Sequence, residues 1–303
     1  MIKKPLKKLI KLFISTKPKV AHISLNGVIG GGSRFEKGLN LENVFPLLET
    51  AFELDGIKAV AISVNSPGGS PVQSELIYNA IRELSAEKKI PVYTFAQDVA
   101  ASGGYWLLLS GDEIYAHNSS IIGSIGVIFS SFGFVDAIKK LGVERRIYTE
   151  GKNKAILDPF LPEESENIEI LKNAQRDIFE SFKEIVISRR KNKLRSENGQ
   201  VFYQNFGDNC TKNEQNLDGS FLDNKIFTGA FWSGKTALKL GLIDEIADLR
   251  GKMKQKFGPK IKIVNIETKK SFLKSLFSSK NGDFVANLVN EVENKAIFGR
   301  FGL

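Results

Sequence analysis

A serine among small residues stands in the stretch DVAASGGYWLLLSG, between a strand-like segment and a short apolar helical segment. This residue, Ser102, is a candidate nucleophile, because glycines next to it let a substrate backbone approach closely. A serine before a helix more often caps that helix through its hydroxyl, so the local pattern leaves two interpretations open. A nucleophilic serine also needs a base, which must come from elsewhere in the chain.

Two glycine-containing turns, SPGG at 66–69 and ASGG at 101–104, each follow a strand-like run and lead into a helical one. The N–H groups at a helix N-terminus favour a negative charge. If the turns lie side by side, an N–H group of Gly68 or Gly69 and that of Gly103 would converge on one oxygen. Such a pair is an oxyanion hole for acyl transfer.

Two kinds of base are available to Ser102. The chain has only two histidines: His22 lies in the expected first strand, and His117 ends the strand after the Ser102 helix. We interpret His22 as structural, whereas His117 is the candidate for a histidine triad. A lysine also serves when burial or a positive dipole leaves it neutral near pH 7. Lys152 and Lys154 in EGKNKAILDPF are the lysine candidates, since they follow a predicted strand at a glycine turn.

Hydrophobic periodicity predicts alternating strands and helices. Continuous β-branched runs such as IKAVAISVN indicate buried strands, and SELIYNAIRELSAEKK indicates a helix. This alternation predicts an α/β fold with helices flanking a mostly parallel sheet. Further along, residues 121–129 and 143–149 are predicted as strands, 162–191 as a long helix, and 227–258 as two helices around a turn.

The net charge of +9 belongs mostly to residues 1–19, which hold seven lysines and no acid. A charge of about +2 (9 − 7) remains for the rest, so we expect no nucleic-acid partner. Apolar residues between these lysines are typical of a segment on an anionic membrane surface or of a solvated arm. The segment is too short and charged to span a bilayer and lacks a secretory cleavage pattern. We expect a cytoplasmic protein or one peripheral on the inner membrane; the single Cys210 leaves no internal disulfide.

Four blocks of the chain, DVAASGGYW, IIGSIGV, EGKNKAILDPF and FTGAFWSGKTALKLGLID, resemble the signal peptide peptidase family. This is the SppA/SohB group of Ser-Lys serine peptidases (peptidase family S49), whose fold is that of the Clp protease and crotonase superfamily. The resemblance runs from about residue 20 to about residue 257, with the blocks in the family's order. It departs at LDNKIFTG, where many members have ADGR before F/Y-T-G.

The resemblance implies a role for individual residues. The serine of the A-S-G-G-Y block is Ser102, implied as nucleophile. The family's G-x-x-K block corresponds to Gly151 and Lys154, so that Lys154 is implied as general base and Lys152 as its solvated neighbour. Ser124 of the G-S-I-G-V block is implied to hold the lysine amine, and the two glycine turns to form the oxyanion hole.

A ClpP/crotonase-like fold with repeated β-β-α units is therefore expected in a peptidase domain at 20–267. A basic tail at 1–19 precedes it, a polar excursion at about 192–224 interrupts it, and a helical extension at 268–303 follows. The implied activity is endopeptidase cleavage of hydrophobic or remnant signal peptides through an acyl-enzyme, with no cofactor or metal, in a homo-oligomer. The alternatives are a crotonase-type acyl-coenzyme A enzyme and an inactive membrane-associated scaffold.

Overall fold

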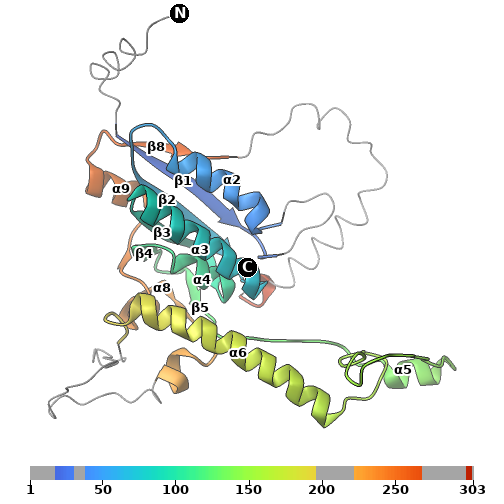
Figure 1. The fold of residues 1–303 in the computed structure, drawn as a ribbon. Helices are drawn as coiled ribbons and strands as arrows, with labels where there is room; N and C mark the ends of the chain where they lie inside the picture. Colours follow the sequence, from blue (N-terminus) through green and yellow to red (C-terminus); the bar gives the residue numbers. More distant parts are fainter. Residues whose placement is uncertain (1–17, 31–37, 196–221, 268–297, 302–303) are drawn as a thin grey trace, which may run out of the picture. The chain divides into compact units, whose positions relative to one another are not determined.

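The computed structural model describes residues 18–30, 38–195, 222–267 and 298–301 (Figure 1). The chain forms two compact units. Unit 1 consists of residues 1–125 and 185–303, and unit 2 of residues 126–184. The sheet and the Ser102 segment belong to unit 1, and the lysine candidates belong to unit 2.

The described part of unit 1 contains an eight-stranded sheet. Its strands are β1 (Lys19–Asn26), β2 (Ile57–Ser66), β3 (Val92–Ala101), β4 (Glu113–Ala116), β5 (Ile121–Gly123), β6 (Phe231–Ser233), β7 (Glu245–Ile246) and β8 (Lys262–Asn265). The order is β6-β5-β3-β2-β1-β8, and β4 pairs with β3 and with β7. Every pair is parallel except β5 with β6. The predicted α/β class with a mostly parallel sheet is confirmed.

Helices connect the parallel strands. Those of unit 1 are α2 (Leu41–Phe52), α3 (Pro71–Lys88), α4 (Gly103–Leu108), the π-helical turn η1 (Leu222–Ile226), α8 (Gly234–Lys239) and α9 (Leu249–Phe257). Unit 2 contains α5 (Val135–Lys140), and α6 (Ser165–Arg190) runs from unit 2 into unit 1. Helix α3 starts with proline at its first turn, and the Ser70 hydroxyl accepts the Gln73 N–H as a cap. Both features favour a helix start directly after the SPGG turn.

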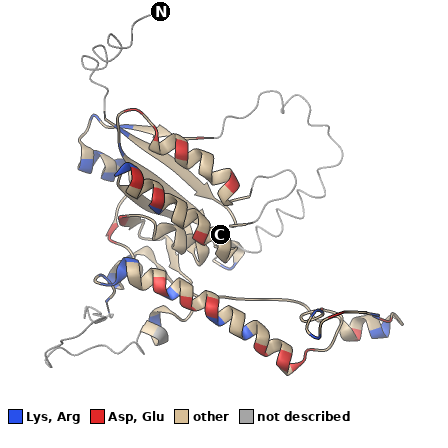
Figure 2. Ribbon diagram, in the orientation of Figure 1, with Lys and Arg blue, Asp and Glu red and all other residues tan. Residues whose placement is uncertain are grey.

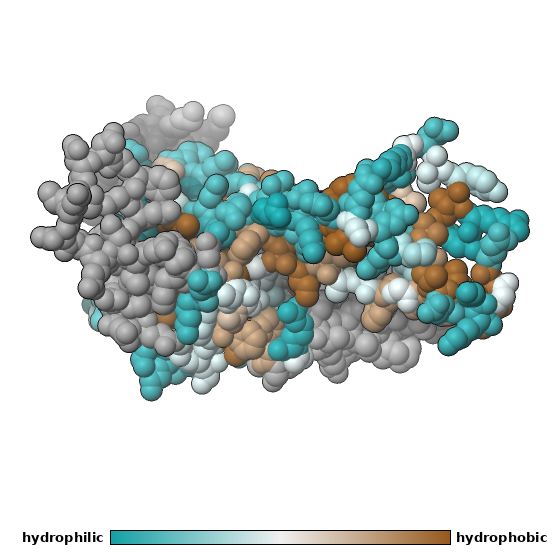
Figure 3. All heavy atoms as spheres, turned by 90° about the horizontal axis from the view of Figure 1, so that it is seen from below, coloured by the Kyte–Doolittle hydropathy of each residue, from teal (hydrophilic) through white to brown (hydrophobic). Residues whose placement is uncertain are grey.

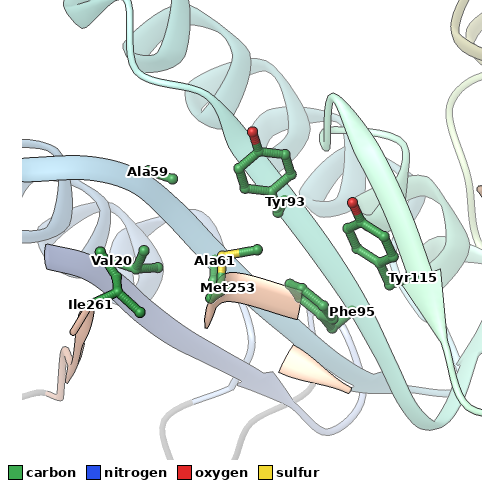
Figure 4. Packing of buried hydrophobic residues seen from close by; sticks show 8 residues of the cluster. All are labelled: Val20, Ala59, Ala61, Tyr93, Phe95, Tyr115, Met253 and Ile261. Carbon is green, nitrogen blue, oxygen red and sulfur yellow. The ribbon is translucent and has the colours of Figure 1, made fainter. Parts of the chain in front are cut away.

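Side chains of alternate strand residues separate into two faces of the sheet. One face carries an apolar cluster beside α9 (Figure 4), made of Val20, Ala59, Ala61, Tyr93, Phe95, Tyr115, Met253 and Ile261. The intervening residues, such as Ile23 and Ile62, are also fully buried. They face the opposite side, where α2 and α3 lie (Figure 1). Burial on both faces explains why the central strands read as continuous hydrophobic runs.

Three sequence-based predictions of elements are wrong in part. Residues 143–149 form no strand, since no described segment of unit 2 pairs with them and most of them are exposed. The segment predicted as a strand at 121–129 ends its pairing at Gly123, because Ser124 turns the backbone to a φ of 52°. The region predicted as two helices contains α8 and α9, but also the short strands β6 and β7. Strands of two or three residues depend on tertiary pairing, which periodicity does not reveal.

Several predicted segments lie outside the described residues. These are 1–17 of the basic tail, 196–221 of the polar excursion, and 268–297 of the C-terminal extension. The predictions for them stay predictions. Among the helices that the structure does describe, none has the length and apolar character needed to cross a membrane.

A buried ion pair fixes the C-terminal end of α6 to the sheet of unit 1. Arg190 is 2% exposed, and its Nη1 lies 2.9 and 3.0 Å from the two carboxylate oxygens of Asp244. Its Nε donates to the Gly241 carbonyl, and Asp244 accepts the N–H of Ile114 and pairs with Lys193. Burial by itself would raise the pKa of Asp244, but Arg190 and these hydrogen bonds hold that pKa below its ordinary value.

Replacing Asp244 with asparagine should leave Arg190 buried without its counter-charge. We expect the free energy of unfolding at pH 7, measured with urea, to fall by about 3–5 kcal/mol. Because the folded-state pKa of Asp244 is lowered, the ion pair contributes its full stability to the fold above about pH 4, the ordinary pKa of an aspartate carboxyl. That stability is lost as the pH falls through the folded-state pKa. A loss below about 1 kcal/mol at pH 7 would contradict this prediction. So would a difference in unfolding free energy between the wild type and the variant that does not decrease in acid.

Candidate active site

Ser102 occupies the turn between the end of β3 and the start of α4. Its φ of 53° and ψ of −122° lie where residues other than glycine are rarely found. Such a backbone costs about 1–3 kcal/mol and is typical of functional sites. Ser102 holds the N-cap position of α4, but its hydroxyl makes no capping hydrogen bond. The capping interpretation therefore does not explain why a serine stands here.

The two glycine turns touch each other at Ser102. Strands β2 and β3 are parallel and pair Ser66 with Ala100, so both turns leave the same edge of the sheet. A Cβ atom added to Gly68 would lie 2.7 Å from the Cβ of Ser102 and 3.0 Å from the Gly103 nitrogen. Only a residue without a side chain allows this approach. The predicted juxtaposition of the turns is present in the structure.

The N–H groups of these turns differ in their partners. The Gly68 N–H donates to the Ser66 hydroxyl at 3.2 Å. Within the described part of the chain, the N–H groups of Gly69 and Gly103 have no hydrogen-bond acceptor. Gly69 has a φ of 144° and sits directly against the backbone of Ile29, which receives the Ser70 N–H. Of the two alternatives for the first donor, the geometry therefore favours Gly69 over Gly68.

Ser124 stands next to Ser102 at the end of the adjacent strand. Strand β5 pairs with β3 in parallel, with Gly123 opposite Ala101, and the Ser102 N–H donates to the Gly123 carbonyl at 2.7 Å. The φ of Ser124 is 52°, and its N–H donates to the Ala230 carbonyl at 2.7 Å. Two neighbouring serines thus share a strained backbone at the carboxyl edge of the sheet.

The far end of α4 is held by arginines that the sequence did not single out. Arg189 donates from Nε to the Leu109 carbonyl at 2.9 Å and from Nη2 to the Gly111 carbonyl at 2.7 Å. Arg82 donates to the Ser110 carbonyl at 2.9 Å. Cations at a helix C-terminus satisfy its free carbonyls and its partial negative charge. Arg82 and Arg189 therefore hold the short helix that follows Ser102, although both are distant from α4 in the sequence.

The lysine candidates lie in a turn of unit 2 that is stabilised locally. The Lys154 N–H donates to the Gly151 carbonyl at 3.1 Å, and the Lys154 side chain is exposed. Lys152 Nζ lies 2.8 Å from both carboxylate oxygens of Glu166. Hydrogen bonding to Glu166, followed by its charge, raises the pKa of Lys152. Among the described residues, the Lys154 amine has no hydrogen bond or ion pair.

The histidines lie away from Ser102. His22 is fixed by Asn265 Oδ1 at 3.0 Å and Ser63 Oγ at 2.8 Å, which agrees with its structural interpretation. His117 follows β4, which pairs with β3 at residues 93–95, several residues before Ser102. By this register His117 is level with residue 97, five residues before Ser102. At roughly 3.3 Å per strand residue, this offset along the strand is about 17 Å. The alternative of a histidine triad is not supported.

Comparison with known proteins agrees with these features. A model of peptidase family S49 matches residues 85–204. The putative protease slr0021 of Synechocystis is 30% identical over 235 residues, which cover 77% of this chain and 71% of that protein. The chain belongs to peptidase family S49. This membership confirms the resemblance seen in the sequence and favours a peptidase over an acyl-coenzyme A enzyme.

Two further curated proteins and one solved structure are also similar to this chain. The putative signal peptide peptidase SppA of Enterococcus faecium is 30% identical, covering 75% of this chain and 60% of that protein. A Brucella abortus protein named Na(+)/H(+) antiporter NhaA is 41% identical over 98% of this chain, which spans only 39% of that protein. One similar solved structure is that of a lysine-to-alanine mutant of the 1510-N membrane-bound stomatin-specific protease in complex with a substrate peptide. Its TM-score is 0.46 at 16% sequence identity, and the match covers 87% of this chain and 97% of that chain.

Adding a methyl group at Gly68 tests the contact between the turns. Gly68→Ala should displace Ser102 and lower peptidase kcat/KM by about 100-fold, since a shift of about 1 Å suffices for such a loss. Gly27→Ala is the matched control, because Gly27 also has a φ near 100° but faces open space. Both variants carry the cost of a side chain at a positive φ, and Gly68→Ala should lose more stability in urea unfolding because of the close contacts with Ser102 and Gly103. Both should remain folded, and only Gly68→Ala should lose activity. Equal activity in the two variants would contradict the account.

Proposed function

We propose that this S49 protein is a serine endopeptidase in which Ser102 is the nucleophile and Lys154 the general base. Ser124 orients the lysine amine, and the N–H groups of Gly69 and Gly103 form the oxyanion hole. The observation that carries the proposal is the contact of two glycine turns around a strained serine whose hydroxyl caps nothing. An uncapped hydroxyl beside two N–H groups without acceptors in the described chain is the arrangement that acyl transfer requires.

Lys154 is preferred to Lys152 because of their different surroundings. A general base must be neutral when it accepts a proton. Lys152 is held by both oxygens of Glu166, and this contact favours its charged form. The Lys154 amine has no such partner among the described residues and is free to pair with another group.

The reaction would proceed in two steps. Lys154 takes the proton of the Ser102 hydroxyl as Ser102 Oγ attacks the peptide carbonyl, and the new oxyanion receives hydrogen bonds from Gly69 and Gly103. The C–N bond then breaks, and the leaving amine takes the proton from Lys154. In the second step Lys154 deprotonates a water molecule, which attacks the acyl-enzyme, releases the carboxylic acid and restores Ser102.

Hydrophobic or remnant signal peptides are the proposed substrates, and the name of the Enterococcus faecium relative supports this class.

We also propose that the chain forms a homo-oligomer. Apolar side chains reach the surface of unit 2 (Figure 3), and the most exposed are Phe132 at 79%, Leu141 at 77% and Tyr148 at 91%. Monomeric proteins rarely expose large apolar side chains in such number on one small unit, which supports a contact with a second copy.

Exchanging each lysine separately tests the assignment of the base. Lys154→Ala should lower kcat by about 100-fold or more, since general-base catalysis contributes about 10²–10⁴-fold, while Lys152→Ala should stay within about twofold of the wild type. Circular dichroism should show both variants folded. Equal losses in the two variants, or an activity in Ser102→Ala equal to the wild type, would overturn the proposal.

A further inference from the structure

A cavity of about 230 Å³ lies in unit 1, and Ser102 is not among its lining residues. It opens where the apolar cluster beside α9 gives way to polar residues of the same sheet face. Phe95 belongs to both the cluster and the cavity, and His22 and Ser63 follow along β1 and β2. The two histidines of the chain, His22 and His117, both line this cavity.

Several polar side chains of the cavity can donate hydrogen bonds to a ligand. His22 uses the carbonyl oxygen of Asn265, which leaves the amide N–H groups of Asn265 available. Across the described residues, the side chains of Gln97, His117 and Arg250 make no hydrogen bond or ion pair. No carboxylate of the described chain lines the cavity, so nothing in its wall neutralises the Arg250 guanidinium.

The two acidic residues nearest in sequence already accept hydrogen bonds from the protein. Asp98 accepts a hydrogen bond from Asn65, and Asp248 caps α9 by accepting the Gly251 N–H. Helix α9 begins at Leu249 beside the cavity, and the carboxylate of its N-cap Asp248 offsets the partial positive charge of its N-terminus. Basic residues also gather along α9 (Figure 2): Lys252 and Lys256 pair with Glu245 and Glu113, whereas Arg250 and Lys254 make no ion pair with any described residue. The positive charge at the cavity that has no carboxylate partner in the described chain is therefore that of Arg250.

Apolar groups make up the remaining wall. Phe95, Leu249 and Ile263 line the cavity beside the donors. Sites for drug-sized ligands occupy about 300–1,000 Å³, so this cavity suits a smaller molecule. A guanidinium binds a carboxylate through charge-assisted hydrogen bonds, and amide donors can complete its coordination. The wall thus matches a ligand with one carboxylate and one short apolar group.

We propose that this cavity binds an organic carboxylate that bears a short apolar group. The carboxylate pairs with Arg250 and receives hydrogen bonds from Gln97 and Asn265, while Phe95 and Ile263 contact the apolar group. This is the chemistry of a peptide's C-terminal residue and also of a small branched acid. The inference does not depend on the role of Ser102, because the cavity is lined by other residues.

Calorimetric titration of the full-length Ser102→Ala protein tests the site without any turnover. N-acetyl-leucine should bind with saturation, and N-acetyl-leucinamide, which lacks the charge, should bind at least about tenfold more weakly. A hydrogen bond to a charged group contributes about 1.5–3 kcal/mol, which corresponds to a tenfold change or more. Arg250→Gln should weaken N-acetyl-leucine binding by the same factor. Lys254→Gln, the matched control, removes the same charge from the same helix outside the cavity.

Three results would overturn the proposal. The first is equal affinity for N-acetyl-leucine and N-acetyl-leucinamide, and the second is an equal effect of Arg250→Gln and Lys254→Gln. The third is inorganic phosphate that binds as tightly as N-acetyl-leucine and displaces it.

Two further probes separate the sources of the carboxylate. Tighter binding of N-acetyl-Gly-Gly-Leu than of 4-methylpentanoate supports a peptide C-terminus, and the reverse order supports a small free acid.

Discussion

The close approach of the Gly68 turn to Ser102 is the constraint on which the rest of the site depends. Two parallel neighbouring strands end at the same edge of the sheet, and their following turns share one space. A side chain at Gly68 would fill that space, one at Gly69 would collide with the Ile29 backbone, and one at Gly103 would collide with the Ser74 hydroxyl. The strained backbone conformation of Ser102 persists because these surrounding contacts hold it in place.

Much of unit 1 serves to hold that strained turn in place. Ser70 caps the N-terminal end of α3, so the SPGG turn leads directly into a stable helix. Arg189 and Arg82 bind the carbonyls at the other end of α4. Because Arg189 lies beside Arg190, whose pair with Asp244 is buried, the end of α6 is fixed on two sides. Residues distant in sequence thereby hold the short helix that follows Ser102 through hydrogen bonds and a buried ion pair.

The sequence alone was sufficient for the α/β class, the two glycine turns and the place of Ser102, because each rests on a local pattern. Buried parallel strands read as hydrophobic runs, and glycines mark turns. It was not sufficient for β6 and β7, whose pairing with β5 and β4 bridges more than 100 residues. Arg189 and Arg82 likewise look like ordinary surface residues until the fold brings them to α4. The predicted strand at 143–149 failed because periodicity cannot show that a strand lacks a partner.

Reaction with a fluorophosphonate, followed by mass mapping of the modified residue, tests the central claim most directly. This reagent modifies activated serines, so it reports the nucleophile and the reaction class together. We predict one adduct, located on Ser102, and no adduct in the Ser102→Ala protein. An adduct on another serine, or peptide cleavage by a protein in which Ser102 is never modified, would contradict it.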